Sequence, residues 1–348
     1  MLGAWSRRAV SARASQCMAF RAATNVVRHA STKEPKNAAA QSVTKIAYEE
    51  ALKLIELDKK ERLEMLGRVE KEIARVKKAE SPTKDAQLAA LESLKFDLQV
   101  KSELNDPEIQ RNFKLGIVDM SRPVYRYMRK KQFEKAPLAT LMERITQMRV
   151  VPDLLPLDTK PVVDVGIRMN GRNEAIEPGV FTKPEETIQL PEINVTSFHP
   201  ETRLYTFFLV DPDSPDVANK TYQQYCHWIQ TNVPISATQP QVKGGDTILE
   251  YVPPHPQKGT KYHRYTLIAY EQPNNGQDKV DFKVDKRDGF DARKLAQQYA
   301  LQARGVSFFR QVWDETVSTI YKDILRAHEP IYGKPPREEP YIRRAVYL

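Results

Sequence analysis

The chain has 348 residues, of which 41% are hydrophobic and 28% charged, and its formal net charge is +9. This composition is that of a globular protein rather than a disordered one, and the length predicts about two domains of roughly 150 residues each. No apolar run of about 18 residues occurs, which excludes a membrane-spanning helix. The two cysteines, Cys17 and Cys226, are too few and too far apart for a disulfide framework, so we expect a reduced compartment.

The first 32 residues are basic and contain no acidic side chain. They hold five arginines among serine, alanine and scattered apolar residues, and the first acid is Glu34. This pattern is typical of a mitochondrial transit peptide, whereas a secretory signal would need a continuous apolar core. We therefore expect residues 1–32 to be a presequence and the protein to reside in the mitochondrial matrix. The alternative is a disordered basic tail.

Residues 33–106 are predicted to form a helical arm. One face of a long helix at 46–79 shows 3-4-3-4 spacing; it comprises Leu52, Ile55, Lys59, Arg62, Leu66, Val69, Ile73 and Val76. Two of these positions are charged, which argues against a self-sufficient coiled coil. Ser81-Pro82 predicts the start of a second helix that runs to about Leu104. The arm either packs on its own domain as a hairpin or lies on a partner. We favour the partner, because an extended arm has little core of its own.

The segment 107–154 is a basic and aromatic connector. Between residues 111 and 150 ten basic side chains oppose three acidic ones, a net +7, whereas the rest of the chain after residue 32 carries −3. Basic side chains neutralise phosphates and aromatic rings stack on bases, so an RNA partner is indicated. A solvated charged face is the alternative. The candidate RNA-binding residues are Arg122, Arg126, Arg129, Lys130, Lys131 and Lys135.

The sequence pattern of residues 155–328 is typical of a β-domain. Short apolar runs such as "VVDVGIRM", "TIQLPEINV", "LYTFFLV" and "HRYTLIAYEQ" are separated by turn residues, which predicts an antiparallel sheet or sandwich over about 155–285. Helical patterns follow in "FDARKLAQQYAL" and "FFRQVWDETVSTIYKDILRAH". Residues 329–348 are rich in proline and tyrosine and are expected to be an extended tail that orders against a partner.

"FFLVDPDSPD" followed by His227 resembles the signature of the phosphatidylethanolamine-binding protein family. "YVPPHPQKGTKYHRYTLIAYEQ", "FDARKLAQQYAL" and "FFRQVWDE" resemble later blocks of that family, over roughly 155–325. The resemblance implies an α+β fold: a family-like antiparallel β-sandwich with C-terminal helices, here preceded by the helical arm. It also implies a pocket for a phosphate-like anion, with candidate residues Asp211, Asp213, His227, His255, His263 and Tyr265.

One loop departs from the family pattern. Family members carry a glycine-containing G-x-G-P-P loop where this chain has Pro253-Pro254-His255-Pro256. Glycine lets the backbone approach an anion, whereas proline offers no N–H and His255 brings a bulky ring. We therefore expect the anion site to be altered or closed, and we expect no small-molecule ligand.

Other chemistry has little support in the sequence. There is no G-x-S-x-G elbow, P-loop, H-E-x-x-H or C-x-x-C motif, and His255 and His263 lack zinc-ligand spacing. A nucleophilic role for Cys226 is disfavoured by its place inside an expected strand. We expect no enzyme activity, no metal and no cofactor.

The presequence, arm, connector and altered domain together resemble a family of mitochondrial large-ribosomal-subunit proteins that carry a phosphatidylethanolamine-binding-protein-like domain. "GIVDMSRPVYR" and "VVPDLLP" support this resemblance, which covers most of residues 46–348. It implies a structural component of the large subunit that supports mitochondrial translation, with mitochondrial ribosomal RNA and other large-subunit ribosomal proteins as partners. The alternative is a soluble mitochondrial binding module for phospholipid headgroups or other phosphate-bearing ligands.

Overall fold

The computed structural model describes residues 36–78 and 83–333, with side chains from residue 44 onward. The expected presequence at 1–32, the serine–proline helix start at 81–82 and most of the expected tail at 329–348 lie outside the described residues. The chain divides into two compact units, residues 1–54 and residues 55–348. Within the described ranges, no helix combines the length and apolar character needed to cross a bilayer.

Helix α1, Lys36–Lys78, begins before the predicted residue 46. All eight positions of the predicted stripe are buried or half-buried, so the 3-4-3-4 pattern identified the correct face. Other positions of α1 carry exposed apolar side chains, among them Ile46, Tyr48 and Leu54. These rings and methyl groups remain in contact with water in the isolated chain.

Helix α2, Lys84–Leu104, is joined to the part of α1 that belongs to the second unit. Lys95 pairs with Glu70 at 2.8 Å, and Lys59 pairs with Asp106, just beyond α2, at 3.7 Å. The same helix contacts α4, Pro123–Lys135. This part of the arm therefore packs on its own chain, as the hairpin alternative required, and a partner for the exposed side of α1 stays a prediction.

The connector consists of short helices. α3 (Pro107–Lys114), α4 and α5 (Pro137–Gln147) each begin with proline, whose fixed φ suits the first helical position. Asp106 caps α3 by accepting a hydrogen bond from the Glu108 amide. A small core of Ile109, Val124 and Tyr125 holds α3 and α4 together, and α6 (Val150–Asp153) leads into the β-domain.

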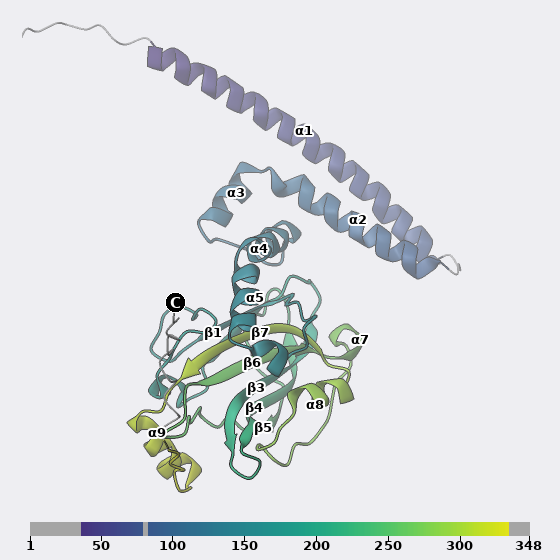
Figure 1. Cartoon of the computed structure of the whole chain (residues 1–348). Helices are drawn as coiled ribbons and strands as arrows, with labels where there is room; N and C mark the ends of the chain where they lie inside the picture. Colours follow the sequence, from purple (N-terminus) through teal and green to yellow (C-terminus); the bar gives the residue numbers. More distant parts are fainter. Residues whose placement is uncertain (1–35, 79–82, 334–348) are drawn as a thin grey trace, which may run out of the picture. The chain divides into compact units, whose positions relative to one another are not determined.

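The β-domain is built on a five-stranded antiparallel sheet with the order β5-β4-β3-β6-β7 (Figure 1). Its strands are β3 (Arg203–Asp216), β4 (Thr221–Ile235), β5 (Asp246–Leu249), β6 (His263–Glu271) and β7 (Gln302–Gln311). A second sheet pairs β1 (Asp164–Arg168) with β2 (Glu192–Thr196).

Two hydrophobic cores lie on opposite faces of the five-stranded sheet. Along β3, Phe207 and Leu209 point to the core shared with β1 and β2, whereas Phe208 and Val210 point to the core covered by α5, α6 and α8. Strand β7 approaches β1 closely at Gly305, because a Cβ there would lie 2.5 Å from a methyl carbon of Val165. The result is the predicted α+β fold, an antiparallel β-sandwich flanked by helices.

The last predicted helix is wrong in its first part. Phe308 and Phe309 belong to β7, and they pack into the two different cores, which a strand permits and one helix face does not. Helical structure starts only at α9 (Glu315–Thr319) and continues as a π-helix, η2 (Ile320–Leu325). "FFRQ" is therefore not part of a C-terminal helix. The other short elements are η1 (Pro184–Thr187), α7 (Pro273–Gly276) and α8 (Ala292–Gln298).

Candidate functional site

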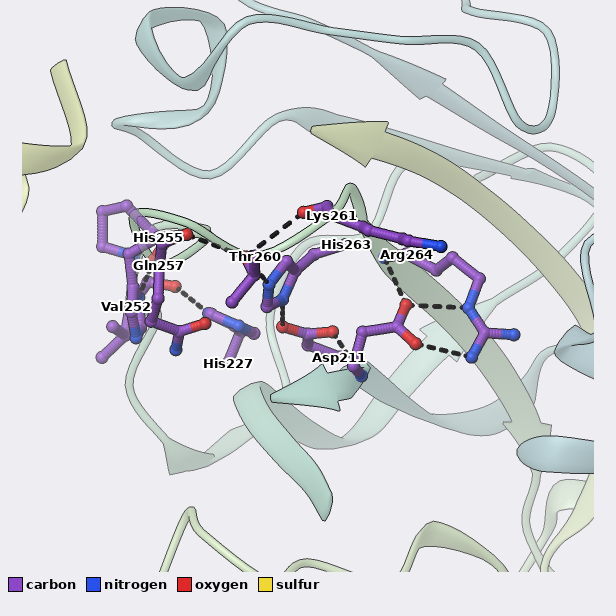
Figure 2. A network of polar contacts seen from close by, with 11 residues as sticks. Asp211, His227, Val252, His255, Gln257, Thr260, Lys261, His263 and Arg264 are labelled. Atoms are coloured by element: carbon purple, nitrogen blue, oxygen red, sulfur yellow. Dashed lines mark hydrogen bonds and ion pairs between the residues drawn. The ribbon is translucent and has the colours of Figure 1, made fainter. Parts of the chain in front are cut away.

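The family-type site lies at one end of the sheet, where β3, β4 and β6 bring three side chains together. Asp211 comes from β3, His227 from β4 and His263 from β6 (Figure 2). The His263 ring uses both nitrogens: Nδ1 lies 2.7 Å from Asp211 Oδ2 and Nε2 lies 2.8 Å from the Thr260 hydroxyl. The spacing of the sequence motif thus corresponds to three neighbouring strands of one sheet.

His255 fills the space beside this cluster. Its ring lies edge-on at 5.0 Å from His227 and at 5.3 Å from Tyr321, measured between centroids, and it is 6% exposed. Each imidazole has a backbone partner, since His227 Nδ1 bonds Val252 O at 2.9 Å and His255 Nδ1 bonds Pro253 O at 2.7 Å. The segment 253–257 is buried throughout. Protein side chains therefore occupy the position where a glycine loop would leave room.

Burial also removes charge from the site. It lowers the pKa of His227 and of His255, so both rings are neutral near pH 7. Burial raises the pKa of Tyr265 well above its usual value, and the Tyr265 hydroxyl has no hydrogen-bond partner. Two neutral imidazoles and a buried phenol offer little attraction to an anion.

Asp213 belongs to a different arrangement from the one expected. Its carboxylate accepts hydrogen bonds from Arg264 at 2.7 and 2.8 Å, and Arg264 also reaches Met148 O at 2.7 Å and Asp153 at 2.9 Å. Arg264 therefore ties the connector to strands β3 and β6. A surface cavity of about 680 Å³ is lined by this clasp, including the carboxylates of Asp153 and Asp213, and by Arg149, Lys261 and His263 among others.

The structure disfavours the remaining catalytic candidate. Cys226 is buried, and burial raises the pKa of its thiol to about 12, so the nucleophilic thiolate is scarce at neutral pH. Among the described residues, no group of three or more histidine, cysteine or carboxylate side chains is arranged to hold a metal ion.

The candidate RNA-binding residues lie on or beside α4, but they are not equivalent. Lys130, Lys131 and Lys135 are exposed. Arg129 and Arg122 are half-buried, and Arg122 pairs with Glu103 at 3.0 Å. Lys130 and Lys131 share Glu134, an exposed pairing of the kind that contributes little stability and can be exchanged for a phosphate.

Arg126, also a candidate RNA-binding residue, differs from the others because it is buried. Arg126 is only 6% exposed, and its guanidinium donates to the carbonyls of Met120 at 3.1 Å and Ser121 at 2.6 Å. Its position on the inner side of α4 explains the difference, because a charge run in a sequence does not show which side of the helix faces the protein.

A second polar cluster was not found from the sequence. Glu271, 2% exposed, receives hydrogen bonds from Arg203 at 2.7 Å and Arg304 at 2.6 Å, at the end of the sheet opposite to Asp211. The three residues come from β3, β6 and β7 and share no short motif, so only the strand register brings them together.

An aspartate–histidine cluster on three adjacent strands of a β-sandwich is the arrangement that the resemblance to the phosphatidylethanolamine-binding proteins implied. A comparison of sequences agrees with it. The sequence model of the phosphatidylethanolamine-binding protein family matches residues 169–308. The phosphatidylethanolamine-binding protein from Plasmodium vivax, 24% identical, aligns with 50% of this chain and 97% of its own at a TM-score of 0.42. The match to the family model thus covers part of the β-domain within a longer sequence.

Two curated relatives extend the comparison. Large ribosomal subunit protein mL38 of Schizosaccharomyces pombe is 27% identical over 234 residues, covering 67% of this chain and 76% of the relative. Putative odorant-binding protein A5 of Drosophila melanogaster is 28% identical over 192 residues, covering 53% of this chain and 85% of the relative. The similarity to mL38 is longer than the matched family domain and confirms the resemblance to large-subunit ribosomal proteins.

Proposed function

We propose that the protein is a structural, non-enzymatic component of the large subunit of the mitochondrial ribosome. In the mitochondrial matrix it binds ribosomal RNA and neighbouring ribosomal proteins and thereby supports mitochondrial translation. The observation that carries this proposal is the α4 basic surface, formed by Lys130, Lys131 and Lys135. In the same chain, the aspartate–histidine site is filled by the protein's own imidazole and aromatic rings. The similarity to mL38 supports the same assignment.

The test is reversal of charge on this surface. Lys130→Glu, Lys131→Glu and Lys135→Glu together are expected to weaken incorporation, because each lysine neutralises RNA phosphate. The variant is expressed in mitochondria and followed by gradient sedimentation at low and at higher salt. The matched control is Lys279→Glu, Lys283→Glu and Lys286→Glu, three exposed lysines of the β-domain.

Three outcomes are informative. Loss of the α4 variant alone from the large-subunit fractions supports the proposal. Equal incorporation of both triple variants contradicts RNA binding through α4. Migration of the unaltered protein at the top of the gradient at both salts contradicts the ribosomal assignment itself.

The surface cavity beside His263 supports a second candidate, binding of phosphate-bearing ligands by the β-domain. Arg149 and Lys261 contribute positive charge to its lining. Titration of the purified protein with inorganic phosphate and phosphoethanolamine, followed by NMR of the histidine side chains, tests this candidate. Saturable shifts at His263 would support it, and unchanged spectra would dismiss it.

A further inference from the structure

A cavity of about 490 Å³ lies at the end of the sheet opposite to the family-type site. Tyr205 and Glu271, which are paired in the β3–β6 register, line it. Asp211 lies six residues further along β3, about 20 Å away at the rise of an extended strand. The cavity is therefore distinct from the aspartate–histidine cluster, and its volume is in the range of small-molecule sites, about 300–1,000 Å³.

The lining is strongly basic. Five cationic side chains contribute to it against two carboxylates, those of Asp97 and Glu271; the cations are Arg126, Lys130, Lys131, Arg203 and Arg304. Arg203 and Arg304 share the carboxylate of Glu271, and Arg203 also pairs with Glu201 at 3.4 Å. An anion that enters the cavity would therefore meet its excess of positive charge mainly on the side of α4.

Arg126 adds an independent sign of a missing partner. Its side chain is more than nine-tenths buried, lines the cavity, and has an Nε–H with no hydrogen-bond partner. Burial of an unpaired guanidinium donor is costly, and it lowers the pKa of Arg126. An anion in the cavity would offset the cost of burying this charge.

Aromatic rings complete the lining. Tyr127 on α4 and Phe198 in the loop after β2 both line it, and both are half-buried. His199 stacks parallel to Tyr205 with 6.2 Å between centroids, and burial lowers its pKa, so this ring is neutral near pH 7. Planar rings beside guanidinium groups are the usual platform for a nucleic acid base.

We propose that this cavity binds one nucleotide, with its phosphate held by the arginine and lysine side chains and its base stacked on Tyr127 and Phe198. Two sources supply that chemistry: an unstacked nucleotide of a bound RNA, or a free mononucleotide. The first deepens the proposed RNA-binding function and rests on it, because α4 lines the cavity and carries the basic surface. Binding of a free mononucleotide does not depend on the proposed RNA-binding function.

The experiment measures binding of the purified full chain to a short single-stranded RNA over a range of salt, and separately to uridine and adenosine monophosphate. Tyr127→Ala is expected to weaken RNA binding about tenfold, as for loss of one base stack, with the salt dependence unchanged. Tyr127→Phe, which keeps the ring, is expected to bind normally. The matched control Lys135→Gln, outside the cavity lining, is expected to lower the slope of log affinity against log salt by about 0.7.

Photo-cross-linking of RNA containing 4-thiouridine, mapped by mass spectrometry, locates the base, and adducts on Tyr127 or Phe198 are the expected result. If the Tyr127→Ala variant bound RNA with normal affinity and the adducts lay elsewhere, the proposed nucleotide cavity would be wrong, although the protein would still bind RNA. Binding of a monophosphate that Tyr127→Ala abolishes, without RNA binding, would support the free nucleotide and contradict the proposed RNA function. Absence of both kinds of binding would overturn both proposals.

Discussion

Three histidines share one buried site and yet differ in their tendency to hold a proton. His227 and His255 bond to backbone carbonyls in a closely packed group of rings, and burial lowers the pKa of each. Burial also disfavours a charged His263, but the Asp211 carboxylate at 2.7 Å outweighs it and raises the pKa of that ring. The site therefore combines two rings whose surroundings favour the neutral form with one ring, His263, whose surroundings favour the protonated form.

This difference predicts an effect of pH on stability. Because the folded-state pKa of His255 is lowered, the unfolded chain binds more protons below about pH 6.5, and stability falls as the pH falls through that value. His255→Phe removes one such site, which is expected to reduce the acid slope by up to about 1.4 kcal/mol per pH unit. Chemical denaturation between neutral pH and about pH 5 measures the slope.

The matched control is His328→Phe, at an exposed position, and the acid slopes of the two variants are compared. His263 acts in the opposite sense, since its raised pKa gives stability that is lost as the pH rises through that pKa. An acid slope in His255→Phe equal to that of the unaltered protein would show that His255 is not held neutral by burial.

The sequence motif located the polar centre of the site but not what surrounds it. Asp211, His227 and His263 each fall within or at the end of an apolar run, and adjacent strands then bring them together. Tyr321 comes from the π-helix that follows α9, so its contact with His255 depends on how the C-terminal segment crosses the sheet. Long-range packing of this kind leaves no local pattern, and the same is true of the inward position of Arg126.

At the scale of elements, Arg264 makes the clearest connection between connector and sheet. It reaches Asp213 on β3 and both Met148 and Asp153 of the connector, and its side chain is 11% exposed. Arg293 of α8 donates to the Asp153 carbonyl at 3.2 Å and adds a second tie. The segment 148–153 is thereby held from two directions.

Arg264→Lys is expected to destabilise the protein by about 1–3 kcal/mol, because lysine cannot reproduce the bidentate bond and the half-buried Asp213 carboxylate loses part of its hydrogen bonding. Hydrogen exchange should also become faster at residues 148–153. Urea denaturation and exchange measured by mass spectrometry provide the two readouts. Arg172→Lys alters an exposed bidentate pair with Glu186 and is expected to cost less than about 1 kcal/mol. Equal losses in the two variants would contradict the clasp.

Among the elements, strands with buried runs were the easiest to predict and the C-terminal segment the hardest. "LYTFFLV" became the centre of β3 because its residues alternate between two cores. "FFRQVWDETVSTIYKDILRAH" combines a strand end, a break at Val312–Asp314 and a helical segment, and its apolar spacing fits a helix by coincidence. Only the pairing of β7 with β6 shows that the first residues of this segment form a strand and not a helix.

At the scale of the whole molecule, charge and exposed apolar surface lie on different parts of the chain. The excess of basic residues is in the connector, as the sequence predicted, whereas α1 carries exposed apolar side chains such as Ile46, Tyr48 and Leu54. A protein that remained alone in solution would gain nothing from such exposure. The distribution fits RNA contact through the connector and protein contact through the arm.

Removal of residues 1–54, the first compact unit, is therefore expected to leave the folding of the remainder intact. The thermal midpoint of the shortened chain should stay within about 2 °C of the full chain, since less than about 1 kcal/mol of stability is at stake. Ile73→Ala, a buried position of α1 in the second unit, should instead cost about 2 kcal/mol or more. Calorimetry of both proteins provides the comparison.

The same shortened chain, joined to residues 1–32 so that it keeps the expected presequence, should be incorporated poorly into the large subunit, because the exposed apolar side chains of α1 at residues 46–54 have been removed. Stable folding together with weak incorporation would assign the arm to assembly rather than to stability. A midpoint several degrees lower would show that residues 36–54 support the rest of the chain, and the division into two independent units would then be wrong. Normal incorporation of a stable, shortened chain would place the protein contacts elsewhere and leave the connector as the main attachment.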